Sequence, residues 1–141
     1  MSKFALKSIE AIGNAPGFMQ LVIFRNTDEI IQESIELEEG VMDIFETSIQ
    51  KSDQPSLVKI LTYMDILINN PAQLLPKTKY NTLTPKKDPV AEYEFKHGRL
   101  RVYGITTIDM KRVIVHCGYK NKQSEDMTRF RSLKKQFLDQ Y

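Results

Sequence analysis

Three apolar segments separated by short turns constrain the fold of this chain more than any other feature of its sequence. They read VAEYEF, LRVYGITT and KRVIVHCGY and occupy residues 90–95, 100–107 and 111–119. Segments of this length that are rich in β-branched and aromatic residues are typical of strands. His97-Gly98 suits a tight hairpin turn, and residues 108–110 supply a second turn. The pattern therefore predicts a three-stranded antiparallel meander.

The segment after the meander predicts a closing helix, from about Ser124 to residue 141. Its apolar side chains recur at helical spacing, whereas most of its basic side chains lie on the other faces. The apolar face consists of Met127, Phe130, Leu133, Phe137 and Leu138. This helix is expected to close an edge of the sheet.

The first half of the chain predicts one more strand and two helices. FMQLVIF, residues 18–24, is a short apolar run rich in β-forming residues. Apolar positions have roughly helical spacing between residues 30 and 49, although Gly40 interrupts them. Residues 52–55, Ser-Asp-Gln-Pro, are typical of the start of a second helix, which Asn-Asn-Pro at residues 69–71 would stop.

These elements place the chain in the α+β class, as a small antiparallel sheet packed on two N-terminal helices with a closing C-terminal helix. The 141 residues fit one domain that can bury a core without disulfides or metal. Residues 1–17, ahead of the first predicted strand, are assigned to an N-terminal extension. Residues 71–89 carry four prolines and several lysines, which predicts an extended, irregular connector and not a domain boundary.

The charge is distributed unevenly along the chain, although the net charge is only +2. Residues 1–75 hold five basic and eleven acidic side chains, whereas residues 76–141 hold fifteen basic and seven acidic ones. Such asymmetry suggests that one half binds a polyanion. The alternative is that folding brings the halves together, so that their charges interleave on a solvated surface.

Several classes of protein receive no support from the sequence. No apolar run approaches the roughly 18 to 20 residues needed to span a bilayer, and the N-terminus lacks the apolar core of a signal peptide. The single cysteine, Cys117, cannot form an internal disulfide, so a cytoplasmic protein without a membrane partner is expected. Two histidines, one cysteine and no clustered carboxylates predict no metal site.

A basic turn directly follows the last predicted strand. Gly118, Tyr119, Lys120, Asn121 and Lys122 stand where that strand leaves the sheet, just before the basic helix. Lysine binds a phosphate as a point charge, and tyrosine stacks on a nucleobase or donates a hydrogen bond. We therefore expect this corner to face a phosphate backbone. The alternative is a polar turn that faces solvent.

The order of these elements and two short motifs resemble the RelE/HigB toxins of the RelE/ParE superfamily, in particular its phage-derived members. One motif is GRLRVY at residues 98–103, a hairpin that carries an arginine before a valine. The other is HCGYKNK at residues 116–122, a glycine-aromatic-lysine segment at the end of an apolar strand. The resemblance extends over about residues 18–141 and is specific in the meander and the turn after it.

The resemblance implies a RelE-like fold and a bacterial or phage-derived toxin of a type II toxin–antitoxin system. Such toxins are mRNA interferases, usually acting on ribosome-bound message, and a cognate antitoxin protein neutralises them. They use no metal or other cofactor. The RNA 2′-hydroxyl attacks the neighbouring phosphate and leaves a cyclic phosphate and a free 5′-hydroxyl. This reaction needs a base near the 2′-hydroxyl, cations on the phosphate and a proton donor for the leaving oxygen.

The matched positions supply candidate residues for this endoribonuclease chemistry. Because Arg101 alternates with its strand neighbours, it is predicted to share a face with Arg99 and Tyr103, either as a phosphate clamp or on a solvated face. The resemblance favours Arg101 over Arg99 as the clamp. The expected catalytic set, in acid, base or binding roles, is Arg101, Tyr119, Lys120 and Lys122. The expected RNA-binding set is Arg99, Lys86, Lys87 and Arg129.

His116 and Cys117 alternate within the last strand, so only one of them can face a given side of the sheet. A buried free cysteine is common, and a catalytic role for Cys117 is disfavoured. We favour a structural role for His116, with an auxiliary proton donor as the alternative. His97 is assigned to the hairpin turn.

Two departures from the family pattern leave a second class of function open. The N-terminal half is acidic and long, and the segment after Lys120 has Asn121 and Gln123 where some active members carry an arginine. The alternative is an inactive, phage-derived member with the toxin fold. It would bind another protein, as gyrase-inhibiting relatives are thought to do, or bind nucleic acid without cutting it. A structural phage-derived protein is a third option.

Overall fold

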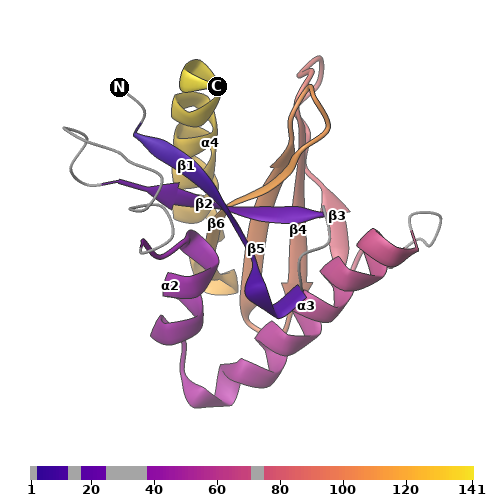
Figure 1. The fold of residues 1–141 in the computed structure, drawn as a ribbon. Coiled ribbons are helices and arrows are strands. Elements are labelled where there is room, and N and C mark those ends of the chain that lie inside the picture. Colours follow the sequence, from indigo (N-terminus) through magenta and orange to yellow (C-terminus); the bar gives the residue numbers. More distant parts are fainter. Residues whose placement is uncertain (1–2, 13–16, 25–37, 71–74) are drawn as a thin grey trace.

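The computed structural model describes residues 3–12, 17–24, 38–70 and 75–141, and within them one sheet lies between helices (Figure 1). The six strands follow the spatial order β1-β2-β6-β5-β4-β3. Their bounds are β1 (Phe4–Ser8), β2 (Phe18–Ile23), β3 (Tyr80–Thr82), β4 (Ala91–His97), β5 (Leu100–Thr106) and β6 (Arg112–Tyr119). The helices are α2 (Val41–Ser48), α3 (Gln54–Asn69) and α4 (Gln123–Gln140), with short 3-10 turns at Glu10–Ile12, Lys51–Asp53 and Lys120–Lys122. The predicted α+β class is confirmed.

The meander predicted from the three apolar segments is present as β4, β5 and β6. His97 pairs with Leu100 across the antiparallel β4–β5 hairpin. Gly98 in the turn has a φ of 54°, a left-handed conformation that glycine adopts without steric cost. β5 and β6 also pair antiparallel, with Leu100 opposite Tyr119. The turn of the β4–β5 hairpin therefore lies beside the end of β6.

The sheet is mixed, which corrects the prediction of a purely antiparallel sheet. β2 runs parallel to β6, with Phe18 opposite Arg112 and Gln20 opposite Ile114. The other neighbouring strands pair antiparallel. Parallel neighbours need a crossover connection, and the chain between β2 and β6 includes α2 and α3. The segment that contains α2 and α3 therefore supplies the crossover that a parallel pair requires.

Helices cover both faces of the sheet (Figure 1). α2 and α3 pack on one face, over a core that includes Phe18, Phe95 and Val102. α4 packs on the opposite face, over a core that includes Tyr103 and Ile105. Alternation along β5 sends Val102 and Tyr103 to these two different cores. α4 therefore covers a face of the sheet and does not close an edge, contrary to the prediction, because its apolar stripe joins the second core.

The two helices predicted in the first half are observed where the structure describes the chain. α2 begins at Val41, directly after Gly40, and α3 begins at Gln54 as predicted from the Ser-Asp-Gln-Pro segment. The predicted helical residues 30–37 lie outside the described residues. The connector predicted for residues 71–89 contributes the short edge strand β3.

Residues 4–8, which the sequence analysis left in an N-terminal extension, form the edge strand β1. β1 pairs antiparallel with β2. Phe4 is buried and packs edge-on against Phe137 of α4, with ring centroids 6.3 Å apart. The side-chain amide of Gln140 accepts a hydrogen bond from the Phe4 N–H (3.0 Å) and donates one to the Phe4 carbonyl (2.7 Å). Contacts so distant in sequence leave no local pattern, so β1 was missed.

A buried glutamine of β2 caps the first turn of α2. Oε1 of Gln20 accepts hydrogen bonds from the N–H groups of Met42 (3.0 Å) and Asp43 (3.2 Å), and its Nε2 donates to the Ser8 carbonyl (3.1 Å). These bonds satisfy two N–H groups that have no partner within the helix. Gly40 lies against this amide, and a Cβ atom at that position would collide with it.

Replacing Gln20 with leucine is expected to lower the free energy of unfolding by about 1–3 kcal/mol, because it leaves buried N–H groups of α2 without an acceptor. Urea denaturation followed by circular dichroism measures this difference. Gln136→Leu, at a partly exposed glutamine of α4, is the matched control and should change stability by less than about 0.5 kcal/mol. Equal effects of the two substitutions would contradict the capping role.

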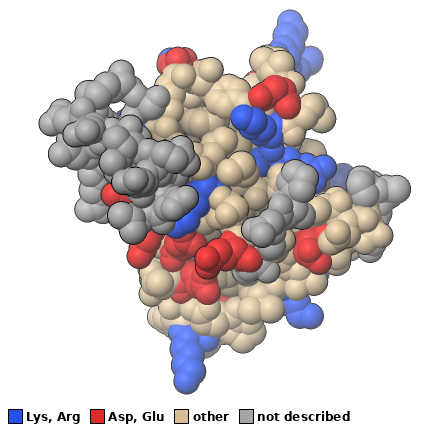
Figure 2. All heavy atoms as spheres, viewed as in Figure 1, with Lys and Arg blue, Asp and Glu red and all other residues tan. Residues whose placement is uncertain are grey.

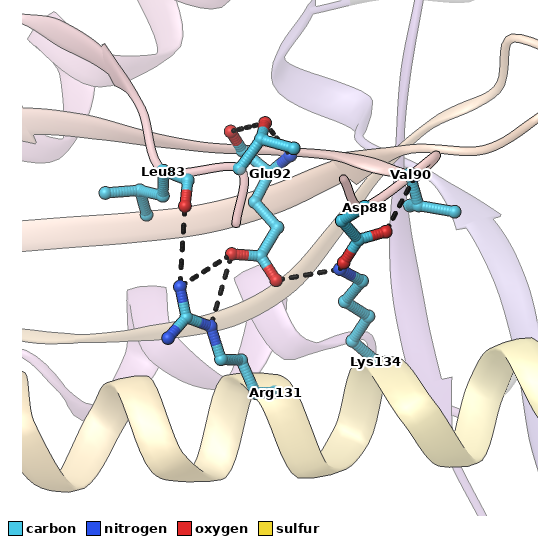
Figure 3. Close-up of polar contacts among 7 residues, drawn as sticks. Leu83, Asp88, Val90, Glu92, Arg131 and Lys134 are labelled. Carbon is cyan, nitrogen blue, oxygen red and sulfur yellow. Dashed lines mark hydrogen bonds and ion pairs between the residues drawn. The ribbon is translucent and has the colours of Figure 1, made fainter. Parts of the chain in front are cut away.

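A buried ion-pair network joins α4 to β4 and to the connector (Figure 3). Nζ of the buried Lys134 donates to Asp88 Oδ2 at 2.6 Å and to Glu92 Oε2 at 2.8 Å. Arg131 donates to Glu92 Oε1 from Nε (3.3 Å) and from one terminal nitrogen (3.1 Å), and that nitrogen also reaches the Leu83 carbonyl (3.4 Å). Two cations of the basic helix are thus used to hold the fold together.

Candidate nucleic-acid interface

Two adjoining hollows lie at the corner where β6 passes into α4. The larger has a volume of about 560 Å³ and the smaller one of about 390 Å³. Arg99, Tyr119 and Asn121 line both hollows, Lys122 lines the larger and Lys120 lines the smaller. The basic turn predicted from the sequence therefore surrounds a concave surface, together with the arginine of the β4–β5 hairpin.

Arg99 is held between an aromatic ring and a buried carboxylate. Its guanidinium carbon lies 5.5 Å from the centroid of the Tyr119 ring. It donates two hydrogen bonds to Asp53, at 2.5 Å and 3.2 Å, and these bonds raise the pKa of Arg99 above its ordinary value. The side chain remains 59% exposed. Arg99 is therefore fixed in position while one part of its guanidinium still faces solvent.

The hairpin and the basic turn are joined through their backbones. The N–H of Lys120 donates to the Arg99 carbonyl at 2.7 Å. Lys120 and Lys122 are exposed, and Lys122 lies 4.0 Å from Glu125, an exposed ion pair that contributes little stability. Both ammonium groups are therefore available to an anion that enters the hollows.

Arg101 is buried and does not share a face with Arg99, although alternation along β5 places it on the same face as Tyr103, as predicted. Its side chain is only 8% exposed, and one terminal nitrogen donates to the carbonyls of Gly98 (2.9 Å) and Leu100 (2.7 Å). It lines neither hollow. Arg99 precedes the first residue of β5, so it belongs to the turn, reaches Asp53 and does not share the strand face of Arg101. The guanidinium of Arg101 stabilises the hairpin through these backbone carbonyls. The predicted alternative, in which Arg101 lies on a solvated face, is therefore wrong.

The remaining predicted RNA-binding residues do not gather at this corner. Lys86 and Lys87 precede β4, whereas the hairpin follows it, and the seven residues of β4 span roughly 20 Å. Arg129 is exposed on α4 but lines neither hollow. Of the predicted RNA-binding set, Arg99 alone lines the hollows.

The basic half of the sequence does not form one uniform surface. On the face shown in Figure 2, acidic side chains gather around the region of α2 and α3, and Lys and Arg side chains are scattered over the rest. Arg131 and Lys134 are already paired with Asp88 and Glu92. These pairs join cations and carboxylates within residues 76–141, so part of the positive charge of that half is neutralised within the half itself.

A row of polar side chains under α4 was not singled out from the sequence. Glu94 of β4 is opposite Tyr103 of β5, which is opposite His116 of β6. Burial raises the pKa of Tyr103 to about 12. His116 Nε2 lies 2.9 Å from Oδ1 of Asp126 on α4. Among the described residues, the buried side-chain atoms without a hydrogen-bond partner include Glu94 Oε2, Arg101 Nε and Asp126 Oδ2.

His116 and Cys117 face opposite sides of the sheet, as their alternation predicted. A register shift in the β5–β6 pairing, where Tyr103 is opposite His116 but Gly104 is opposite Ile114, turns His116 toward α4. The Cys117 thiol lies on the other side, 3.5 Å from the sulfur of Met42. Burial raises the pKa of this thiol, so it is not disposed to react as a thiolate.

Comparison with known proteins identifies no matching family model, no curated relative and no similar solved structure. Within the described part of the chain, no three His, Cys, Asp or Glu side chains come together in the way metal ligands would. No helix in the described ranges is long and apolar enough to cross a membrane.

Proposed function

We propose that this protein is a toxin of the RelE/HigB kind, an endoribonuclease that cleaves mRNA at the corner between β6 and α4. The observation that carries the proposal is the convergence of Arg99, Tyr119, Lys120 and Lys122 on two adjoining hollows. Three of these four were expected as catalytic residues from the sequence. Cations, an aromatic ring and a concave surface together suit a phosphate flanked by a nucleobase.

In this proposal the scissile phosphate lies in the larger hollow, between the exposed part of Arg99 and the ammonium group of Lys122. The two cations stabilise the charge that develops as the 2′-oxygen bonds to phosphorus and the bond to the 5′-oxygen breaks. One proton leaves the 2′-hydroxyl and another reaches the departing 5′-oxygen, so no water is consumed. Lys120 holds the neighbouring phosphate, and Tyr119 contacts the base.

Arg101, which the resemblance favours as the phosphate clamp, has a different role in this proposal. Its guanidinium is committed to two backbone carbonyls of the hairpin, and it lines neither hollow. It would act indirectly, by fixing the turn from which Arg99 projects. A toxin of this kind implies a cytoplasmic location, ribosome-bound message as the substrate and a cognate antitoxin that covers the basic corner.

Induced expression in a bacterial host tests the proposal. The wild type is expected to arrest growth and create new 5′-ends in message. Lys120→Ala combined with Lys122→Ala should reduce cleavage at least about 100-fold, because one cation at the scissile phosphate and the cation at the neighbouring phosphate are lost. Lys86→Ala combined with Lys87→Ala removes the same charge away from the corner and should leave cleavage within a few fold. Normal growth and intact message with the wild type would overturn the proposal.

A second candidate is a non-catalytic toxin-fold protein that binds nucleic acid or another protein. It is favoured by the commitment of both hairpin arginines to internal partners, Arg99 to Asp53 and Arg101 to carbonyls. Such a protein should arrest growth without new 5′-ends in message, or cause no arrest while retaining RNA affinity that Lys120→Ala weakens. The same mapping experiment distinguishes it from the ribonuclease.

A further inference from the structure

Asp126 is an acidic residue in the wall of an otherwise basic hollow. It lies near the start of α4 and lines the larger hollow beside Gly118, Tyr119 and Lys122. Its Oδ1 lies 2.9 Å from His116 Nε2. Its Oδ2 is buried and has no hydrogen-bond partner among the described residues. Buried polar atoms are nearly always paired, so a spare acceptor beside a hollow requires an explanation.

The backbone of β6 is shaped around this carboxylate. A Cβ atom on Gly118 would collide with Asp126 Oδ2 and with the carboxyl carbon. Glycine at this position therefore lets the carboxyl group lie directly against the strand end. The close approach places Asp126 between the strand and the hollow.

His116 is itself fixed by aromatic packing. Its ring is stacked on Tyr103, with centroids 6.2 Å apart and planes 17° apart. Tyr103 in turn is stacked on Phe130 of α4, with centroids 5.6 Å apart and planes 26° apart. The register shift between β5 and β6 turns His116 into this stack. The imidazole is therefore a rigid support for Asp126 and not a mobile surface group.

We propose, on the basis of the proposed ribonuclease function, that Asp126 is the general base of the reaction and that His116 is its positioning residue. The Asp126 carboxylate takes the proton of the 2′-hydroxyl as that oxygen bonds to phosphorus. The bond between phosphorus and the 5′-oxygen breaks, and the 5′-oxygen takes a proton from the cationic side of the hollow, where Lys122 lies. The products are a cyclic phosphate and a free 5′-hydroxyl.

The charges around Asp126 suit this role. The titratable groups that face it are His116 from β6, Tyr103 from β5 and Lys122 from the turn. Lys122 carries a positive charge and His116 hydrogen-bonds to the carboxylate. The anionic base is therefore compatible with an RNA phosphate in the same hollow, because Arg99 and Lys122 offset its charge.

The test uses purified full-length protein with an RNA oligonucleotide and its 2′-deoxy analogue, which binds but cannot be cleaved. Asp126→Asn keeps the shape of the side chain and should lower kcat by about 10²–10⁴-fold, with affinity for the analogue unchanged within threefold. Asp139→Asn, at an exposed α4 carboxylate outside the hollow, is the control and should leave kcat unchanged.

His116→Ala tests positioning separately from folding. The kcat of this variant should fall at least about tenfold, with KM and the affinity for the analogue within threefold, because the carboxylate loses the partner that orients it. His116→Gln, which keeps a hydrogen-bond donor, should restore most of kcat. A merely structural histidine would lower the melting temperature and leave kcat of the folded protein in place. If Asp126→Asn does not fold, this comparison decides, and an unchanged kcat of folded His116→Ala overturns the inference.

The failure of the inference and that of the proposed function are distinguishable. Cleavage by wild type together with cleavage by Asp126→Asn within threefold overturns the role of Asp126 and leaves the ribonuclease standing. If the wild type does not cleave RNA, the proposed ribonuclease function is overturned, and the role of Asp126 as general base is overturned with it. Loss of analogue binding by the Asp126→Asn variant would identify a binding residue and also overturns the inference.

Discussion

Replacing Lys134 with methionine is expected to lower the free energy of unfolding by about 3–5 kcal/mol, because Oε2 of the buried Glu92 carboxylate loses its cationic donor while Arg131 contacts only Oε1. Glu92 is 1% exposed and accepts from Lys134 at 2.8 Å. Methionine retains the apolar stem of the lysine, so the decrease in the free energy of unfolding measures the effect of removing the ammonium group. Urea denaturation at pH 7 measures it. Lys135→Met, at the next residue and 78% exposed, is the control and should cost less than about 1 kcal/mol.

Two further measurements support this interpretation. A double variant, Glu92→Leu with Lys134→Met, should recover much of the lost stability, because the buried carboxylate that Lys134 neutralises is then also absent. The pKa of Asp88 lies below its ordinary value of 3.8, chiefly because of the hydrogen bond from Lys134. That contribution to stability is present above the ordinary pKa and is lost as the pH falls through the lowered one. Lys134→Met should therefore weaken the acid dependence of stability, and an unchanged dependence would contradict the assignment.

The two hairpin arginines are expected to respond in opposite ways. Arg101→Gln should lower the free energy of unfolding by about 2–4 kcal/mol, because two charge-assisted bonds to backbone carbonyls are lost at a buried site. Arg99→Gln, combined with Asp53→Asn so that no carboxylate is left unpaired, should change stability much less than Arg101→Gln, because solvent screens the exposed guanidinium. The same double variant should reduce RNA cleavage at least about 100-fold, since Arg99 faces the proposed phosphate.

Denaturation curves and cleavage rates, measured for both variants below their unfolding transitions, test this division of roles. Folded Arg101→Gln should retain most of the activity of the wild type. If it loses activity while remaining fully folded, and the Arg99 variant keeps its activity, the phosphate clamp is Arg101 and the roles of the two arginines are reversed. Lys96→Gln, at a partly exposed residue opposite Arg101 across the hairpin, controls for a general loss of positive charge.

The elements that could be predicted from the sequence are those with local signals. The alternating segments of the meander, the glycine in the β4–β5 turn and the Ser-Asp-Gln-Pro start of α3 each act over a few residues. The sequence analysis missed β1 because its place depends on Phe137 and Gln140, more than a hundred residues away. The parallel pairing of β2 with β6 and the docking of α4 on a face are likewise consequences of long-range packing.

The candidate site was predicted in part for the same reason. Tyr119, Lys120 and Lys122 are contiguous or nearly so, and their common position at a strand end could be inferred from the strand alone. The prediction that Arg99 shares a face with Arg101 was wrong, because alternation applies only within a strand and Arg99 stands one residue before β5. The partners Asp53 and Asp126 come from separate helical elements, and nothing in their local sequence shows which strand residue each one meets.

The parallel seam between β2 and β6 also governs the order in which the chain can assemble. β1 with β2, and β3 to β6, are each built from neighbours close in sequence, whereas the seam joins residues 18–20 to residues 112–114. Closing a loop of that length costs more conformational entropy than forming a hairpin, and the pairing is therefore slower. We therefore expect these two sets of strands to pair with each other late in folding, so that the seam between β2 and β6 limits the folding rate.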